Sequence, residues 1–392
     1  MSNEVYLAGA VRTPIGTFCG TLESVPAPTL GSAVIKAAIA RAGVPSEQVN
    51  EVIFGNVVSA GLGQNVARQV AIGAGLSPTV GATSVNKVCG SGLKSVMLAA
   101  QAIQCGDASM IVAGGTENMS RAPYLLEKAR SGYRMGNGEL VDAMIRDGLW
   151  DVYKNVHMGL CGDRCAEKYG FTRDQQDEFA ITSFKRAIEA AQKGAFAREI
   201  EPIQVKAGKE TISVSEDENP KKFNEEKLRK LRPAFGDKGT VTAGNASSIN
   251  DGAAAVVVLS AAKVQQLALK PQAKILGYAT YSREPEWFTL APIGAIEKLL
   301  NKLSLSVAQV DLFEINEAFS VVPMAAMKEL QIPREKVNVH GGAVALGHPI
   351  GASGARTLAT LLNALKERNG RVGINCLCIG GGEAVAMAVQ LC

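Results

Sequence analysis

The sequence predicts an α/β fold made of two copies of one half domain. Short apolar runs at residues 5–8, 52–58 and 110–113 alternate with segments of helical period. Strands that alternate with helices are typical of a buried, largely parallel sheet with helices on its faces. The same order of segments returns in the second half of the chain, which predicts a duplication.

The first long helix is expected over residues 30–42. Leu30, Val34 and Ala38 follow the spacing of one helical face, and Gly43 comes just after the last turn. Glycine is the residue that most often ends a helix, because it accepts the left-handed conformation. The helix therefore closes before the next predicted strand.

The repeat is clearest around two asparagines. Residues 46–56, Ser-Glu-Gln-Val-Asn-Glu-Val-Ile-Phe-Gly-Asn, align without gaps on residues 306–316, Ser-Val-Ala-Gln-Val-Asp-Leu-Phe-Glu-Ile-Asn. Cys89 and His348 follow at nearly equal spacing, and each opens a turn rich in glycine that leads into a helical segment. Ligands of such folds bind beyond the carboxyl ends of the strands, so we expect the two halves to share one site.

Residues 119–248 break this pattern. They are charged, with Gly-rich turns at 132–138 and a Lys/Glu-rich stretch at 206–230. An insertion of this kind commonly forms a lid or binding lobe. We therefore divide the chain into an N-terminal half (1–118 plus 249–269), an inserted loop domain (119–248) and a C-terminal half (270–392).

Composition excludes several classes of protein. The 392 residues exceed what one core usually organises, and a net charge of +4 from 41 basic and 37 acidic residues does not suggest a nucleic-acid partner. No apolar run is long enough to cross a bilayer, and neither end carries a recognisable targeting signal. The eight scattered cysteines fit a reducing compartment, so we expect a cytoplasmic protein without a membrane partner.

Cys89 is the first candidate for chemistry. It opens Cys-Gly-Ser-Gly directly before the helical run 93–103. The unpaired amides and positive dipole end of a helix stabilise a thiolate, so we expect a lowered pKa and a nucleophile at Cys89. His348, in Gly-His-Pro-Ile-Gly-Ala-Ser-Gly-Ala-Arg, is one of three histidines and is placed to act as its base.

Cys378 is the next candidate for chemistry, after Cys89 and His348. Cys378 precedes Ile-Gly-Gly-Gly, whose amides, including that of Gly380, are free to approach and stabilise a developing oxyanion. Asn316 ends the repeated strand and offers an amide at the same sheet edge. Taken singly, each of these residues also has an ordinary structural explanation as a core, turn or loop residue.

Two further patterns are weak. Cys161 and Cys165 have spacing suited to zinc, but no second Cys/His pair supplies the remaining ligands, so we expect no metal. Neither a Gly-Lys-Ser/Thr loop nor a Gly-x-Gly-x-x-Gly turn follows the first strand, which disfavours nucleotide binding at a standard motif.

Taken together, the motifs resemble those of the thiolase family, specifically its short-chain biosynthetic type, over nearly the whole chain. The matching segments are Val11-Arg12-Thr13-Pro14, Asn86-Lys87-Val88-Cys89-Gly-Ser-Gly, Val112-Ala-Gly-Gly-Thr-Glu-Asn-Met-Ser120, Thr242-Ala-Gly-Asn-Ala-Ser247, Asn316-Glu-Ala-Phe319, Gly-His348-Pro-Ile-Gly and Cys378-Ile-Gly-Gly-Gly. The resemblance implies a five-layer α/β/α/β/α arrangement of two pseudo-symmetric mixed sheets with an inserted CoA-binding loop domain.

The resemblance also implies an acetyl-CoA C-acetyltransferase reaction, in which two acetyl-CoA give acetoacetyl-CoA and CoA by a ping-pong route. Cys89, deprotonated by His348, takes the acyl group, and Cys378 removes the α-proton of the second acetyl-CoA. His348 with a water on Asn316 binds one thioester oxygen, and the amides of Cys89 and Gly380 bind the other. CoA is substrate and product, and no cofactor is implied.

By position, the resemblance assigns a set of residues to substrate binding. Those lining the acyl and pantetheine tunnel are His157, Met158, Phe235, Ala243, Ser247, Ala318 and Phe319. Lys221 stands where relatives often have an arginine near the CoA phosphates, and it lacks the bidentate fork of that arginine. Residues 131–138 correspond to a loop that builds tetramers, which implies a homotetramer, a dimer of dimers.

Three alternatives remain at this point. A degradative 3-ketoacyl-CoA thiolase of broader chain length uses the same residues. A decarboxylating ketosynthase has His or Asn in the place of Cys378, which disfavours it. A thiolase-like protein that only binds acyl-CoA or lipid has no need of Cys89, His348 and Cys378 together.

Overall fold

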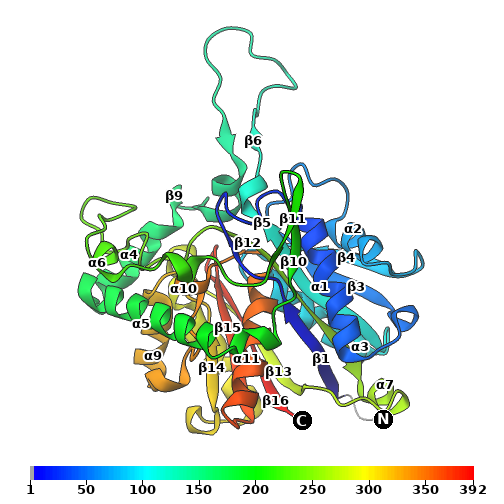
Figure 1. Cartoon of the computed structure of the whole chain (residues 1–392). Helices are drawn as coiled ribbons and strands as arrows, with labels where there is room; N and C mark the ends of the chain where they lie inside the picture. The colour runs from blue at the N-terminus through cyan, green and yellow to red at the C-terminus, as the bar shows by residue number, and fades with distance from the viewer. Residues whose placement is uncertain (1–3) are drawn as a thin grey trace.

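The computed structural model describes residues 4–392 and contains one large mixed sheet with helices on its faces (Figure 1). The sheet has ten strands in the order β14-β15-β16-β13-β1-β12-β5-β3-β4, with β2 paired to β12. The strands are β1 (Val5–Arg12), β2 (Gly16–Thr17), β3 (Glu51–Gly55), β4 (Gly81–Val85), β5 (Met110–Asn118), β12 (Asn250–Ser260), β13 (Ala273–Ser282), β14 (Leu312–Ile315), β15 (Val372–Ile379) and β16 (Glu383–Leu391). The α/β class is confirmed.

The pairing within the sheet is less parallel than the sequence alone predicted. Only β3/β4, β3/β5 and β14/β15 are parallel. The pairs through β12, β1, β13 and β16 are antiparallel, for example β12 with β5 from Asp251 opposite Asn118 to Leu259 opposite Met110. The expectation of a largely parallel sheet was wrong because apolar runs reveal burial on both faces but carry no information about strand direction.

The two predicted sheets are joined along one edge. Strands β1, β12, β5, β3 and β4 belong to the first half, and β13, β16, β15 and β14 belong to the second. The halves meet where β1 pairs with β13 over only two residue pairs, Tyr6 with Lys274 and Leu7 with Ala273. Each half therefore keeps its own sheet and its own carboxyl edge.

Helices complete the five layers. α1 (Ala27–Ala42) and α2 (Val66–Gly73) pack on the outer face of the first half, and α8 (Ala291–Leu303) and α9 (Val321–Leu330) pack on the outer face of the second. Between the halves lie α3 (Ser91–Cys105) and α11 (Ser353–Glu367), which contact each other and share one core with residues of both sheets. As expected, α1 ends at Gly43, whose φ is 66°.

The two central helices start close to the strand ends. The backbone O of Gly351, just before α11, would lie 2.0 Å from a Cβ atom placed on Gly115 in β5. No side chain fits in this gap, so glycine is required here. The close approach brings the turn that carries His348 to the carboxyl end of the first half's sheet.

The inserted segment runs from the end of β5 at Asn118 to the start of β12 at Asn250. It contains strands β6 (Tyr124–Leu125), β7 (Val141–Asp142), β8 (Trp150–Asp151), β9 (Val156–His157), β10 (Ile203–Ala207) and β11 (Glu210–Val214), and helices α4 (Met158–Tyr169), α5 (Arg173–Gln192) and α6 (Glu225–Arg229). The remaining helices of the chain are α7 (Ala261–Gln266) and α10 (Ala343–Leu346). A long loop between β6 and β7 projects away from the body (Figure 1). Within residues 4–392, no helix is long and apolar enough to cross a membrane.

Candidate active site

Cys89 lies in a strained turn between β4 and α3. The preceding residue, Val88, has a φ of 45°, which is rare for a β-branched side chain and costs roughly 1–3 kcal/mol. Ser91 holds the turn, because its Oγ accepts from the Lys87 amide (2.8 Å) and donates to the Val88 carbonyl (2.7 Å). The turn is therefore fixed by local hydrogen bonds that offset its strain.

Residues of the second half contact the turn that carries Cys89. A Cβ atom on Gly90 would lie 2.4 Å from Cδ1 of Ile379, so glycine allows the turn to touch the end of β15. Lys87 also forms an ion pair with Glu383 of β16, with Nζ 2.6 Å from Oε2. The Cys89 turn of one half thus sits directly on the strand end of the other.

The sulfur of Cys89 faces this junction. Burial raises the pKa of the Cys89 thiol to about 11, while hydrogen bonds from the backbone amides of Gly380 and of Cys89 itself act to lower it. The prediction that the start of a helix lowers this pKa was wrong, because the cost of burying a charged sulfur exceeds the gain from the amides. Cys89 is a thiol in the unliganded protein and needs a base.

Cys378 lies at the end of β15, close to Cys89. It is fully buried, and burial raises the pKa of its thiol well above the usual value; charge on Cys89 raises it further. The geometry of the chain leads to the same region, because Gly90 of the Cys89 turn meets Ile379, the residue directly after Cys378. The turn that carries Cys89 and the strand end that carries Cys378 therefore adjoin, although they come from opposite halves of the chain.

His348 contacts Asn316, which follows β14 and whose backbone N–H donates to the Cys376 carbonyl of β15 (2.9 Å). The His348 backbone N–H donates to Oδ1 of Asn250 (2.9 Å), while its Nε2 lies 3.4 Å from Nδ2 of Asn316 and its Nδ1 lies 2.6 Å from Oγ of Ser353. Burial, and then the charge of Arg356, lowers the pKa of His348 to about 3. The imidazole is therefore neutral near pH 7, and one of its ring nitrogens carries a lone pair.

The side-chain oxygen of Asn316 has no hydrogen-bond partner among residues 4–392. This atom, Oδ1, is buried. A buried acceptor without a donor is costly, so this atom marks a place for a water or ligand donor.

The predicted tunnel residues cluster beside the two sulfurs. The rings of His157 and Phe235 stack at 4.4 Å, and Phe235 meets Phe319 edge-on at 6.2 Å. Cε of Met158 lies 3.1 Å from a Cβ atom placed on Gly380, so the cluster reaches the centre. Ser247 and Ala318 adjoin the cluster, because Ala318 precedes Phe319 and its carbonyl accepts from the Ser247 amide (3.0 Å). Ala243 is exposed. The assignment of these residues to substrate binding stays a prediction.

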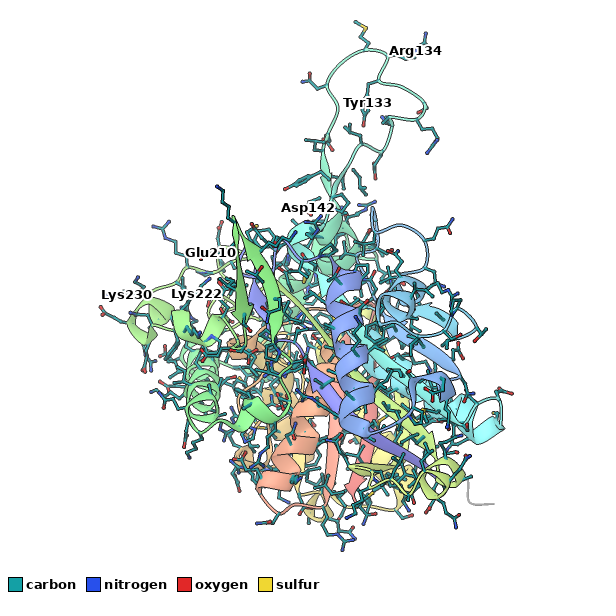
Figure 2. All side chains as sticks on the ribbon, turned by 45° about the vertical axis from the view of Figure 1, so that its right-hand side comes forward. Tyr133, Arg134, Asp142, Glu210, Lys222 and Lys230 are labelled. Atoms are coloured by element: carbon teal, nitrogen blue, oxygen red, sulfur yellow. The ribbon has the colours of Figure 1, made fainter. Side chains whose placement is uncertain are left out.

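Lys221 lies apart from this cluster. Its Nζ forms an ion pair with Oε2 of Glu216, and it lines a cavity of about 720 Å³ with residues of α5 and the segment 194–202. A different groove, next to Gly244, is lined by Lys222 and Lys227 (Figure 2 labels Lys222). Both side chains of this ion pair are largely exposed, so Lys221 also faces solvent.

Two residues that support the centre were not assigned a role from sequence. Glu117 accepts from the amides of Val57, Val58 and Gly351, and thereby clamps the two halves together; burial raises its pKa to about 7. Ser353 contacts His348. Both lie inside motifs given above. Glu117 directly follows Gly114-Gly115-Thr116, and Ser353 comes five residues after His348. Only this adjacency indicates them in the sequence.

No group of three or more Cys, His, Asp or Glu side chains with metal-binding geometry occurs among residues 4–392. Cys161 and Cys165 are buried in α4, and burial raises the pKa of both thiols. These two residues pack in the core of the second half as ordinary apolar side chains.

Comparison with known proteins adds independent findings. Residues 5–262 match the model for the thiolase N-terminal domain, and residues 269–391 match the model for the thiolase C-terminal domain. Acetyl-CoA acetyltransferase 2 of Arabidopsis thaliana is 54% identical over 99% of this chain and 97% of its own. A Gibberella zeae relative named "Acetyl-CoA acetyltransferase ERG10, cytosolic" is 50% identical over 98% of both chains. A thiolase of Ascaris suum solved in complex with coenzyme A aligns with a TM-score of 0.95 at 45% identity, covering 99% of this chain and 100% of its own.

A duplicated α/β scaffold of this topology, with two sulfurs and an imidazole at the junction of its halves, defines an enzyme of the acyltransferase class. The chain belongs to the thiolase family.

Proposed function

We propose that this thiolase is an acetyl-CoA C-acetyltransferase, which condenses two acetyl-CoA to acetoacetyl-CoA and CoA through an acyl-cysteine. The observation that carries the proposal is the junction at Cys89. Gly90 of this turn meets Ile379 at the end of β15, and Cys378 and Gly380 stand on either side of Ile379, so a candidate nucleophile, a second thiol and a glycine amide adjoin. The names of the relatives support the choice of substrate.

In the first half-reaction, His348 Nε2 takes the proton of Cys89, and the thiolate attacks the thioester carbonyl of acetyl-CoA. The amides of Cys89 and Gly380, which already point at the sulfur, stabilise the oxyanion. The C–S bond to CoA then breaks. Because the pKa of Cys378 is raised far above neutral, its thiol still carries a proton, which it gives to the departing CoA thiolate.

In the second half-reaction, the Cys378 thiolate removes the α-proton of a second acetyl-CoA. The thioester oxygen gains charge as the enolate forms, and a water on Oδ1 of Asn316 together with protonated His348 stabilises it. The enolate carbon attacks the acetyl group on Cys89, acetoacetyl-CoA leaves, and the Cys89 thiolate recovers the proton from His348. The protons therefore balance over one cycle, and no metal or redox cofactor is invoked.

A degradative thiolase of broader chain length is the second candidate. Met158, which contacts Gly380 beside the centre, leaves little room for a long acyl chain and favours short substrates. We expect kcat/KM for thiolysis of acetoacetyl-CoA to exceed that for a long-chain 3-ketoacyl-CoA by at least about tenfold. A misfit of a few methylene groups in a pocket changes kcat/KM by this much. Equal values for the two substrates, measured by loss of the ketoacyl-CoA absorbance, assign the broader activity instead.

Lys221 is proposed to approach the CoA phosphates together with Lys222 and Lys227 of the neighbouring groove. Its ion pair with Glu216 is exposed, so little energy is needed to break it. A cytoplasmic location is proposed from the cytosolic relative and from the scattered free cysteines.

The proposed homotetramer rests on the projecting loop between β6 and β7. Figure 2 shows Tyr133 and Arg134 far from the body, with Asp142 at the base of the loop. Large apolar side chains are exposed along it, including Leu126, Met135 and Leu140, and Met135 is 98% exposed. A monomer rarely exposes such a series of apolar residues, which supports contact with other copies of the chain.

Replacing Leu126, Met135 and Leu140 by serine is expected to lower the mass of the assembly from a tetramer to a dimer, because the apolar contacts between dimers are lost. Light scattering after size exclusion measures this mass. Ile212→Ser, which alters an exposed apolar residue of β11 outside the loop, is the control and should leave the mass unchanged. A wild-type tetramer that persists in the triple variant excludes the loop as the assembling element.

A further inference from the structure

Ser353, the first residue of α11, is fully buried against the face of His348 that points away from Asn316. Its Oγ lies 2.6 Å from Nδ1 of His348 and 2.9 Å from the carbonyl oxygen of Pro349. The serine backbone is also fixed, because its carbonyl accepts from Oγ1 of Thr357 (2.9 Å). The hydroxyl therefore has two neighbours at short distance and one proton to share.

The chemistry of these neighbours decides where the proton goes. The Pro349 carbonyl accepts only, so the Ser353 hydroxyl donates to it, and Oγ then accepts from Nδ1–H of His348. If the hydroxyl pointed at Nδ1 instead, two oxygens would face each other at 2.9 Å without a hydrogen between them. The first arrangement is the lower in energy.

This arrangement orients a second residue through the imidazole ring. With Nδ1 protonated, Nε2 carries a lone pair, and Nδ2 of Asn316 at 3.4 Å is a donor toward it. The amide of Asn316 is thereby turned so that Oδ1 points away from His348, and this oxygen is the buried acceptor without a partner. One hydroxyl sets the direction of two groups in the centre.

The next turn of α11 acts on the charge of the same ring. Arg356 is buried, and none of its three guanidinium nitrogens makes a hydrogen bond in the described part of the chain. Its cation disfavours a positive charge on His348, which, together with burial, lowers the pKa of that imidazole. Arg356 therefore favours the neutral ring whose tautomer Ser353 selects.

We propose that Ser353 is a positioning residue that holds His348 with Nδ1 protonated and Nε2 free, and that it thereby turns Oδ1 of Asn316 toward the substrate. The inference deepens the proposed function, since it rests on His348 acting as the base. A histidine held in the wrong tautomer presents N–H where a lone pair is needed. In known hydrolases this change lowers kcat by up to about 10⁴-fold.

The tautomer is measured directly by ¹⁵N NMR of protein labelled at histidine, which contains only three such residues, His157, His340 and His348. In the wild type we expect a protonated Nδ1 and an unprotonated Nε2 at His348. In Ser353→Ala we expect a mixture of tautomers and a fall in kcat of at least about tenfold with little change in KM. Ser353→Thr, which keeps the hydroxyl, should restore the wild-type ¹⁵N pattern.

Ser95→Ala is the matched control. Ser95 is a buried serine of α3, the equivalent helix of the first half, and its Oγ donates to the carbonyls of Gly92 and Gly114 at 2.7 Å without touching the centre. It should lose some stability but keep the His348 pattern and kcat.

A wild-type His348 protonated at Nε2 overturns the proposal, whether or not the variants fold, and so does a Ser353→Ala enzyme with unchanged tautomer and kcat. A changed tautomer with unchanged kcat supports the positioning role and removes instead the assignment of His348 as the base.

Discussion

Replacing Cys89 by alanine is expected to abolish acyl-enzyme formation and to reduce condensation by at least about 10⁴-fold, because no other residue replaces the nucleophile of a covalent mechanism. The neighbouring thiol of Cys378 does not take over. Burial raises the pKa of this thiol well above the usual value, which disfavours the thiolate needed for attack. The fold should survive, since the substitution removes a single sulfur from a partly exposed residue.

Intact mass measured after incubation with acetyl-CoA tests this expectation, followed by peptide mapping of the adduct. The wild type should carry one acetyl group on the peptide with Cys89, and Cys89→Ala should carry none. Cys105→Ala is the matched control, because Cys105 lies exposed at the other end of the same helix, α3. An acetylated Cys89→Ala protein, or a wild type acetylated elsewhere, assigns the nucleophile to another residue.

Much of the fold was accessible from sequence because the duplication leaves a local trace. Residues 46–56 and 306–316 align without gaps, and each segment contains a strand, β3 or β14, that is followed directly by an asparagine. Helical period and a terminal glycine placed α1 to within a few residues. The direction of most strands was not accessible, because most antiparallel pairs, such as β5 with β12, join segments far apart in the chain.

The candidate site was predictable in its membership but not in its electrostatics. A helix start beside Cys89 is visible in the sequence, whereas the burial that raises its pKa depends on how tightly Ile379 and Gly380 close over the turn. The ion pair of Lys221 with Glu216 could not be predicted for a similar reason, since the fold of the inserted segment brings the two side chains together. Sequence indicates the candidate reacting groups, and packing sets the protonation state of each.

Replacing Cys378 by alanine is expected to separate the two half-reactions. Cys89 should still be acetylated fully at the end of the incubation, because His348 and the two amides that serve the first step remain. Condensation should fall by about 10²–10⁴-fold or more, the usual effect of losing a positioned general base. The variant should also fail to exchange the methyl protons of acetyl-CoA with deuterium from solvent, a readout that requires α-proton removal and no carbon–carbon bond.

Cys376→Ala is the control for this variant, because Cys376 is a buried cysteine of the same strand, two residues earlier, and its sulfur lies 3.9 Å from the carbonyl oxygen of Pro292. It should lose stability in proportion to the buried sulfur while it keeps acetylation, deuterium exchange and condensation. If Cys378→Ala exchanges deuterium at the wild-type rate, another group is the base, and Cys378 has a structural role only. If Cys378→Ala is never acetylated, Cys378 is required to release CoA, and the first half-reaction depends on both thiols.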